Sequence, residues 1–196
     1  VDLIGPWKII IQESELNIKA LTSVDTATTL FEIIQIDDKS SQHTFNQFQN
    51  SWLSRYPKPI NVIHDQGGEF IGQAFQNGLA TLGIKSVSIT SKNPQANAVY
   101  ECIHYVIKNM LCTLLLADPS QDISDAYDII DTAFASWMFA SRMAVHCGLR
   151  VSPGGLAFHC NMLLPIPVLA DFDIICQCQQ TLINQNAAKE NCKRNF

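Results

Sequence analysis

Hydrophobic and polar residues alternate along the first third of the chain as they do in β-strands. The segments 1–11, 18–25 and 28–36 are rich in Ile, Val, Leu and Phe, and polar residues separate them. β-branched and aromatic residues favour strands, and short polar connections favour antiparallel neighbours. We therefore expect three successive antiparallel strands, the first of which begins VDLIGPW.

A helical pattern follows these strands. Apolar residues recur at helical spacing from Phe45 to Leu53, after two serines that can cap a helix. Prolines at positions 57 and 59 cannot continue the helix. We expect a helix that packs its aromatic side on the sheet.

A strand, a helix and a second strand come next. The segment 59–63 predicts a buried strand, the apolar positions from Phe70 to Leu82 predict a helix, and the segment 84–90 predicts a fifth strand. Strands joined through a helix usually run parallel, because the crossover returns the chain in the same direction. The order of elements predicts an α/β fold with a five-stranded mixed sheet, three antiparallel strands followed by two parallel ones, flanked by helices.

Two further helices are predicted before the character of the chain changes. Residues 91–97 are expected to form a polar loop, 101–116 a helix with one apolar face, and 120–145 a helix with aromatic residues inside. From about position 148 Pro and Gly punctuate the chain, and a polar segment follows. We expect a core domain over 1–147 and a C-terminal extension over 148–196.

Composition limits the class of protein. The 196 residues are 47% hydrophobic, which suffices for the core of one compact domain. The longest apolar runs are too short for a membrane span and no secretion signal is visible, so we expect a soluble, unsecreted protein with no membrane partner. The seven cysteines show no zinc or disulfide spacing, so no zinc is expected in this fragment. A net charge of −5 disfavours nucleic-acid binding.

Three acidic residues stand where the predicted fold would gather ligands. Asp2 is on the first strand, Asp65 directly follows the fourth, and Glu101 opens the helix after the fifth. Strand ends and helix starts in such a sheet meet at one edge, and carboxylates that converge there would bind Mg²⁺ or Mn²⁺. The spacing alone leaves open whether the three converge.

The motifs around these acids resemble a known family. VDLIGPW, HDQGGEF and NPQANAVYE, with 35 residues between Asp65 and Glu101, are similar to the D,D(35)E core of retroviral and retrotransposon integrases. The block SPGGLAFHCNMLLPIPVLADFD resembles gypsy-type LTR retrotransposons in particular. The resemblance extends over positions 1–175 and implies an RNase H-like fold.

By this resemblance Asp2, Asp65 and Glu101 would be the catalytic residues and the ligands of two Mg²⁺ or Mn²⁺ ions. Such an ion pair activates a water or a DNA 3′-hydroxyl and stabilises the leaving oxygen of a phosphodiester displacement. The implied function is DNA integration by a polynucleotidyl transferase and endonuclease. Such a protein would bind the ends of the element and target DNA. It would assemble as a homo-oligomer and act in a eukaryotic nucleus.

The resemblance also implies residues that contact DNA near the third acid. The loop before this acid would offer neutral amides to DNA, and nearby lysines would contact phosphates. The amides belong to Asn93, Gln95 and Asn97, and the lysines are Lys92 and Lys108. The helix face that carries Lys108 could equally be plain surface.

Several residues have competing explanations. Asp25, at a strand end, is an alternative to Asp2 as the first acid of the site, although its position favours a turn. Glu69 is explained by the helix dipole, because an acid in the first helical turn is stabilised there. His64 either lines the site or simply packs. The letters GGEF also occur in cyclic-dinucleotide synthases, but their longer signature stands at a hairpin, whereas a helix is predicted here.

The chain also departs from the family pattern. Family members commonly carry arginine where this chain has Cys102, Cys176 and Cys178, and one C-to-T change turns several Arg codons into Cys codons. No zinc-binding module precedes Asp2 and no small barrel or chromodomain follows Phe196, so we expect a fragment or a domesticated remnant. Two hypotheses remain open: an active integrase core, or a catalytically silent remnant that binds nucleic acid or protein.

Overall fold

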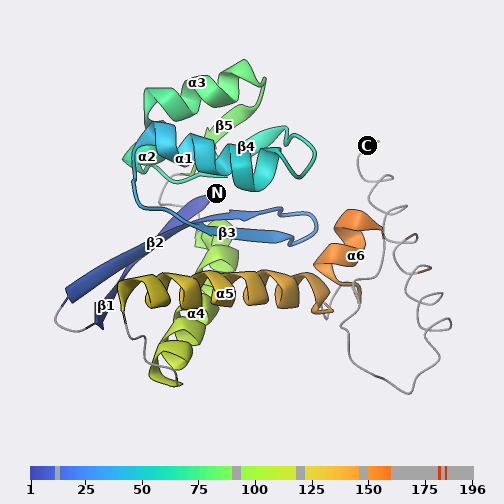
Figure 1. Ribbon diagram of the computed structural model, residues 1–196. Helices are drawn as coiled ribbons and strands as arrows, with labels where there is room; N and C mark the ends of the chain where they lie inside the picture. Colours follow the sequence, from blue (N-terminus) through green and yellow to red (C-terminus); the bar gives the residue numbers. More distant parts are fainter. Residues whose placement is uncertain are drawn as a thin grey trace. The chain divides into compact units, whose positions relative to one another are not determined.

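The computed structural model describes residues 1–11, 14–89, 94–117, 122–145, 150–159, 181 and 184. Strands and helices follow one another along these residues as the sequence pattern indicates (Figure 1). The elements are β1 (Asp2–Ile11), β2 (Ser14–Val24), β3 (Phe31–Gln35), α1 (Ser41–Phe48), a π-helical turn (Gln49–Leu53), β4 (Asn61–His64), α2 (Gly68–Ile71), α3 (Gln73–Thr81), β5 (Lys85–Ser88), α4 (Pro94–Ala117), α5 (Ile123–Met143) and α6 (Pro153–Phe158).

The chain divides into two compact units. One comprises 1–23 and 32–135, and the other comprises 24–31 and 136–196. The first unit carries all three predicted acidic residues, β4, β5 and helices α1 to α4. The predicted boundary between a core over 1–147 and an extension over 148–196 stays a prediction.

The strands form two hydrogen-bonded groups. One is a sheet of order β1-β2-β3, in which β1 and β2 are antiparallel and Asp2 lies opposite Thr22. The other is the parallel pair β4–β5. The nitrogen of Val1 donates a 2.7 Å hydrogen bond to the carbonyl oxygen of Ile63, which joins the start of β1 to β4. The five predicted strands are therefore present, with one hydrogen bond from Val1 connecting the two groups at the edge that carries the acids.

The hairpin of β1 and β2 is longer than the sequence pattern predicts. Polar residues at 12–17 were expected to separate the strands, yet β2 already begins at Ser14. Exposed Glu15 and Asn17 alternate with buried Leu16 and Ile18. This alternation is the pattern of a half-buried strand, in which successive side chains point to opposite faces.

A turn shortens β3 at its start. The Asp25 carboxylate accepts hydrogen bonds from the N–H groups of Ala27 and Thr28 and a 2.6 Å bond from the Thr28 hydroxyl. Asp and Asn side chains favour turns through such local bonds. Asp25 therefore shapes the turn, as its position in the sequence suggested, and β3 begins at Phe31.

The helix predicted from Phe70 to Leu82 is divided in two at Gly72. A side chain there would come within 2.5 Å of the Cβ and Oγ of Ser41 on α1. The Ser41 hydroxyl accepts a 2.9 Å hydrogen bond from the N–H of Phe75 at the start of α3. The close approach of α1, which glycine permits, separates α2 from α3.

Aromatic side chains connect α1, α2 and α3. Phe48, Phe70 and Phe75 are at most 2% exposed. The ring of Phe75 lies 5.3 Å from that of Phe70 and 5.9 Å from that of Phe45, both edge to face. Such pairs add about 0.5–1.5 kcal/mol beyond their buried area. The aromatic cluster therefore makes a rigid support next to β4.

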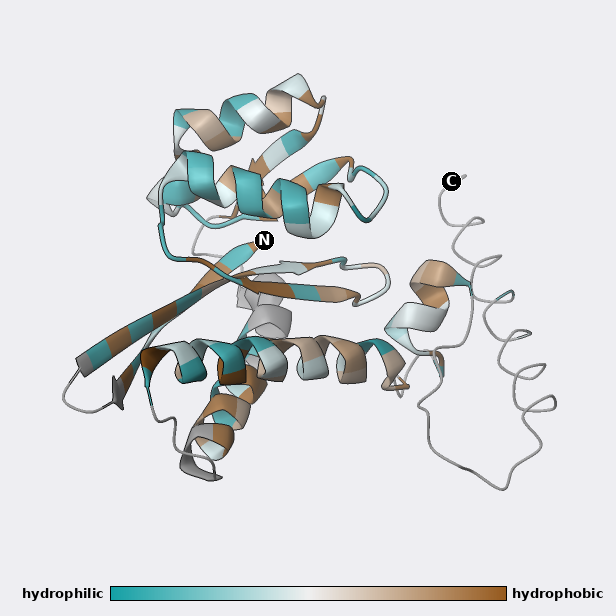
Figure 2. Ribbon diagram, in the orientation of Figure 1, coloured by the Kyte–Doolittle hydropathy of each residue, from teal (hydrophilic) through white to brown (hydrophobic). Residues whose placement is uncertain are grey.

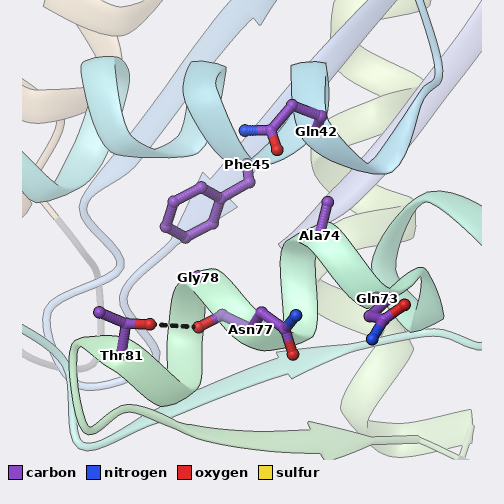
Figure 3. Close-up of a pocket in the computed structure, with 7 residues that line it drawn as sticks. All are labelled: Gln42, Phe45, Gln73, Ala74, Asn77, Gly78 and Thr81. Atoms are coloured by element: carbon purple, nitrogen blue, oxygen red, sulfur yellow. Dashed lines mark hydrogen bonds between the residues drawn. The ribbon is translucent and has the colours of Figure 1, made fainter.

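A groove of about 690 Å³ lies between α1 and α3 (Figure 3). Its lining residues are Gln42, Phe45, Gln73, Ala74, Asn77, Gly78 and Thr81. A Cβ atom at Gly78 would come within 2.5 Å of the Phe45 ring, so the two helices pack closely here. All of these lining side chains are neutral, and the groove therefore offers no charge to a phosphate or a metal ion.

Helix α4 begins at Pro94, earlier than the predicted residue 101. The prediction of a loop over 91–97 is wrong from position 94 onward. Proline suits the first position of a helix, because its φ is already helical and the missing N–H would have no helical partner there. Gln95 and Asn97 therefore belong to the helix, and Lys92 and Asn93 lie outside the described residues.

Helices α4 and α5 pack on the strands through their apolar positions. On α4, Ile107 is fully buried and Leu111 is 3% exposed. On α5, the Phe134 ring lies 6.2 Å from that of Trp7 in β1. Figure 2 shows hydrophobic and hydrophilic residues interleaved along both helices. Within the described part of the chain, none of the helices combines the length and apolar character needed to cross a bilayer.

The segment SPGGLAF forms the short helix α6. Ser152 caps it, because its hydroxyl oxygen accepts a 3.1 Å hydrogen bond from the N–H of Gly155. The polar helix predicted near the C-terminus falls almost entirely outside the described residues.

Candidate functional site

Asp2 stands at the start of β1, where β1 meets β4. Its backbone pairs with Thr22 of β2, and the neighbouring Val1 nitrogen binds the carbonyl oxygen of Ile63 in β4. The carboxylate oxygen Oδ1 accepts a 2.8 Å hydrogen bond from the N–H of Leu3. The side chain is 22% exposed. Asp2 is therefore a largely buried carboxylate with one oxygen held in place.

Asp65 directly follows β4 in a tight turn. Its Oδ1 accepts a 2.9 Å hydrogen bond from the N–H of Gly67. A Cβ atom at Gly67 would lie 3.0 Å from this oxygen and 3.0 Å from Oε1 of Glu69, whereas a Cβ at Gly68 would meet nothing within 4 Å. The carboxylates of Asp65 and Glu69 thus both approach Gly67, which leaves room for them because it has no side chain.

The charges of Asp2 and Asp65 act on each other. Burial raises the pKa of Asp2 to about 6, and the negative charge of Asp65 is the next largest cause. The charge of Glu69 raises the pKa of Asp2 weakly, and the hydrogen bond from the N–H of Leu3 lowers it. A nearby negative charge disfavours ionisation of a carboxyl group. The structure therefore brings together two of the three acids that the sequence singled out.

His64 holds the end of β4 immediately before Asp65. The ring is 2% exposed and stacks on Phe70, with 5.5 Å between ring centroids. Its Nδ1 lies 2.6 Å from the carbonyl oxygen of Asp65, which can only accept, so Nδ1 donates. Nε2 then accepts from the Ser86 hydroxyl of β5 at 2.7 Å. His64 is therefore packed, and it positions the backbone of Asp65.

Glu101 lies exposed on α4. The burial of Ile107 and Leu111 determines which side of α4 faces the strands, and Glu101 lies away from that side. Among the residues that the structure describes, no three Asp, Glu, His or Cys side chains gather closely enough to hold a metal ion. The part of Glu101 in the site stays a prediction.

His104 approaches the acids from α4, one turn after Glu101. Its Nδ1 lies 4.0 Å from Oδ2 of Asp2, and its Nε2 lies 3.3 Å from the Thr22 hydroxyl. Burial lowers the pKa of His104 to about 4, so the ring is neutral at pH 7 and the contact with Asp2 is not an ion pair. The sequence left open whether the helix face that carries His104 and Lys108 belongs to the site or is plain surface. Its position three residues after Glu101 was the available signal.

A pocket of about 300 Å³ adjoins this contact. It is lined by Leu3, Ile4, Gly5 and Trp7 of β1 and by His104, Tyr105 and Lys108 of α4. Lys108 is exposed and is the one cationic side chain among these lining residues. The pocket therefore combines an apolar strand wall with one ammonium group, next to the largely buried Asp2.

The donor set partly fits a divalent metal ion. Asp2 and Asp65 supply the hard carboxylate oxygens that Mg²⁺ and Mn²⁺ prefer. The charge of Asp65 is the second cause, after burial, of the raised pKa of Asp2, and a bound cation would relieve this repulsion. Two carboxylates fit one ion, while a second ion would also need Glu101, which the structure leaves apart from them.

Comparison with known proteins identifies the fold. No protein-family model matches the chain, and no curated protein sequence matches it. Solved structures do match. The magnesium-bound catalytic core domain of HTLV-2 integrase, in a trimeric form, is 19% identical with a TM-score of 0.58, over 80% of this chain and 95% of that one.

Two further structures agree with this match. The catalytic core domain of BIV integrase is 16% identical with a TM-score of 0.57, over 81% of this chain and 93% of that one. A chain of the simian T-cell lymphotropic virus intasome, in complex with a PP2A regulatory subunit, is 16% identical with a TM-score of 0.61, over 87% of this chain and 58% of that one. The chain thus has the α/β, RNase H-like fold of retroviral integrase catalytic cores.

Proposed function

We propose that this chain is the catalytic core of an integrase from a gypsy-type or retrovirus-like element, which cleaves and joins DNA with the help of divalent metal ions. The observation that carries the proposal is the pairing of Asp2 and Asp65. Asp2 begins β1 and Asp65 directly follows β4, and the charge of Asp65 adds to burial in raising the pKa of Asp2. Carboxylate pairs of this kind are costly without a cation.

Asp2 and Asp65 would hold the metal, joined by Glu101 if α4 brings that side chain in. The metal would supply an activated water or 3′-hydroxyl and stabilise the leaving oxygen. The protein prepares this site with its own hydrogen bonds. The N–H groups of Leu3 and Gly67 each hold one carboxylate oxygen, at 2.8 and 2.9 Å. The acids are therefore oriented before any ligand binds, which lowers the cost of binding.

DNA would approach along β1 and α4. The pocket beside His104 presents the ammonium group of Lys108, which is suited to a phosphate of the DNA backbone. Its apolar wall, made by Ile4, Gly5 and Trp7, suits the sugar or base next to that phosphate. Lys92, Asn93, Gln95 and Asn97 are proposed to extend the same contact. A homo-oligomeric assembly and a nuclear location belong to the same proposal.

A second function deserves a test because of Glu101. This residue is exposed and stands apart from the other two acids. If Glu101 never joins the other two acids, the protein would bind nucleic acid or a protein partner without cleaving DNA. The resembled family commonly carries arginine at several positions where this chain has cysteine. Each arginine lost from a phosphate contact weakens DNA binding, so these cysteines favour the same alternative.

A branched-DNA assay separates the two functions. The purified chain is incubated with a disintegration substrate and Mg²⁺ or Mn²⁺, beside Asp65→Asn and Glu101→Gln. An active core nicks or rejoins the DNA, and both variants lose at least about a hundredfold in rate, since each removes a metal ligand. Asp128→Asn, an exposed acid on α5, is the matched control and retains the rate.

The outcomes assign the function clearly. Activity that survives in Asp65→Asn would overturn the proposed site. Activity that is lost in Asp65→Asn but kept in Glu101→Gln would show that Glu101 is not a ligand. An inactive wild-type chain that still binds DNA would support the silent remnant.

A further inference from the structure

Acidic and basic residues are distributed unevenly along this acidic chain. The formal net charge is −5, yet residues 39–100 contain only two acids, Asp65 and Glu69, both beside Gly67. The same residues contain five cationic side chains, which are Lys39, Arg55, Lys58, Lys85 and Lys92. Positive charge is therefore concentrated in the part of the chain that builds α1, β4, α3 and β5.

Two hydrogen bonds bring two of these lysines together at the start of β4. The Lys58 ammonium group donates a 2.8 Å bond to the carbonyl oxygen of Leu82, directly after α3. The N–H of Lys85 donates a 3.0 Å bond to the carbonyl oxygen of Ile60, directly before β4. Among the described residues, neither ammonium group pairs with a carboxylate. We call the surface made by Lys58, Ile60, Leu82 and Lys85 the lysine surface.

Exposed apolar side chains accompany the two lysines. Ile60 is 83% exposed and Leu82 is 37% exposed. Apolar area that faces water gains free energy when another apolar surface covers it. Protein interfaces combine such an apolar centre with a charged rim, whereas the affinity of a nucleic-acid backbone comes from its phosphates. The lysine surface therefore favours a protein partner over a nucleic acid.

The segment 55–60, which supplies half of the lysine surface, is firmly held. Prolines on both sides of Lys58 restrict its backbone. The Tyr56 hydroxyl donates a hydrogen bond to the carboxylate of Glu32 in β3, and the Arg55 guanidinium lies 3.6 Å from the same carboxylate, which is 2% exposed. A surface that is ordered in advance loses little conformational entropy on binding.

We propose that the lysine surface docks a partner protein through a segment in which acidic side chains flank an apolar one. The apolar side chain would cover Ile60 and Leu82, and the acids would pair with the two lysines. The surface is separate from the candidate metal site, because β4 runs between Ile60 and Asp65. Five residues of strand span roughly 16 Å. Partner binding and DNA cleavage would therefore use different residues.

Binding of a synthetic peptide tests this inference. The probe is a fluorescein-labelled peptide of alternating Glu and Leu residues, titrated with the full chain and followed by fluorescence anisotropy. We expect saturable binding that weakens at least about tenfold in the double variant Lys58→Glu/Lys85→Glu, because like charges then face each other. Ile60→Ser should also weaken binding, since the apolar contact is lost. Lys39→Glu changes an exposed lysine outside the surface, so this matched control should bind as wild type does.

Nuclear magnetic resonance locates the contact on the protein. In the ¹⁵N-labelled wild-type chain, the peptide should shift the amide signals of Ile60, Leu82 and Lys85. The signal of Gln42, in the groove between α1 and α3, should stay unchanged. This measurement decides the question even if a variant does not fold.

Several results would overturn the inference. An absence of peptide binding, binding that is unchanged in the double variant, or amide shifts confined to other residues would exclude the lysine surface. Equal binding of a peptide of alternating Glu and Ser would exclude the apolar contact. A DNA duplex that shifts the same amides and displaces the peptide would assign the surface to nucleic acid. Self-association that is lost in the double variant would assign it to a second copy of the chain. None of these results bears on Asp2 or Asp65, so the proposed function is tested separately.

Discussion

At the scale of single residues, Asp2 and His104 are perturbed in opposite directions by the same burial. The folded state favours the protonated form of Asp2 and the neutral form of His104. Each shift corresponds to about 3 kcal/mol between the two protonation states. Because both shifts fall in the acidic range, their effects on stability act over the same pH window with opposite signs.

The pH dependence of unfolding should reveal this opposition. Between pH 3.8 and about 6 folded Asp2 keeps a proton that the unfolded chain has lost, so this group makes stability fall as pH rises. Between about pH 4 and 6.5 unfolded His104 holds a proton that the folded form lacks, so this group makes stability rise with pH. The two contributions nearly cancel in the wild-type chain.

Single variants should expose one contribution each. In His104→Asn the free energy of unfolding should decrease by about 3 kcal/mol from pH 4 to pH 6.5 relative to wild type, and in Asp2→Asn it should increase by a similar amount. Urea unfolding, followed by circular dichroism at several pH values without metal, measures both. Equal slopes in the two variants would contradict the assignment.

At the scale of elements, the connection from β4 to α2 shapes the site. His64 anchors the end of the strand, Asp65 follows, and the N–H of Gly67 holds the Asp65 carboxylate. Of the two glycines in this connection, Gly67 alone is crowded by carboxylates. Neither has a positive φ, so the requirement for glycine at this point is one of space.

The two glycines therefore make a matched pair of variants. Gly67→Ala places a methyl group 3.0 Å from Asp65 Oδ1, so the carboxylate must shift and its hydrogen bond to the turn must weaken. We expect Mn²⁺ affinity to fall by about tenfold, as is typical when the support of a metal ligand is disturbed. Gly68→Ala meets nothing within 4 Å and should bind Mn²⁺ as wild type does. Calorimetry on both variants checks this expectation. A similar loss of Mn²⁺ affinity in the two variants would contradict it.

At the scale of the whole molecule, the two acids of the proposed metal site repel each other and so cost stability in the absence of a cation. The repulsion between Asp2 and Asp65 is present in the folded chain and relaxes on unfolding. A ligand that binds only the folded state stabilises it by an amount that grows with concentration, about 2.7 kcal/mol at a hundred times Kd. A variant that removes one of these two charges should therefore be more stable without metal but should lose the stabilisation that metal binding gives.

Asp65→Asn should show that separation in a denaturation experiment. In EDTA its free energy of unfolding should exceed that of wild type, by on the order of 1 kcal/mol, because the neutral amide no longer repels Asp2. On addition of Mn²⁺ the wild-type chain should gain stability and the variant should not. The control Asp128→Asn should follow wild type in both conditions, and a variant that is less stable in EDTA would argue against repulsion at this site.

Local patterns predicted much of the fold. Apolar periodicity located the five strands and the helices, because burial favours alternation in strands and a stripe in helices. Errors arose where distant contacts overrode the local signal. Gly72 breaks a helix because Ser41 of α1 packs against it, and β2 extends through Glu15 and Asn17 because exposed strand positions tolerate polar residues.

The sequence by itself determined which acids stand at strand ends, because carboxylates next to buried strands and glycines form a recognisable local pattern. It singled out Asp2, Asp65 and Glu101 but left their convergence open, since spacing along a chain carries no distance in space. Only the tertiary structure decided which groups meet. The hydrogen bond from Val1 to Ile63 sets β1 beside β4, and the buried side of α4 turns His104 towards Asp2 and leaves Glu101 exposed.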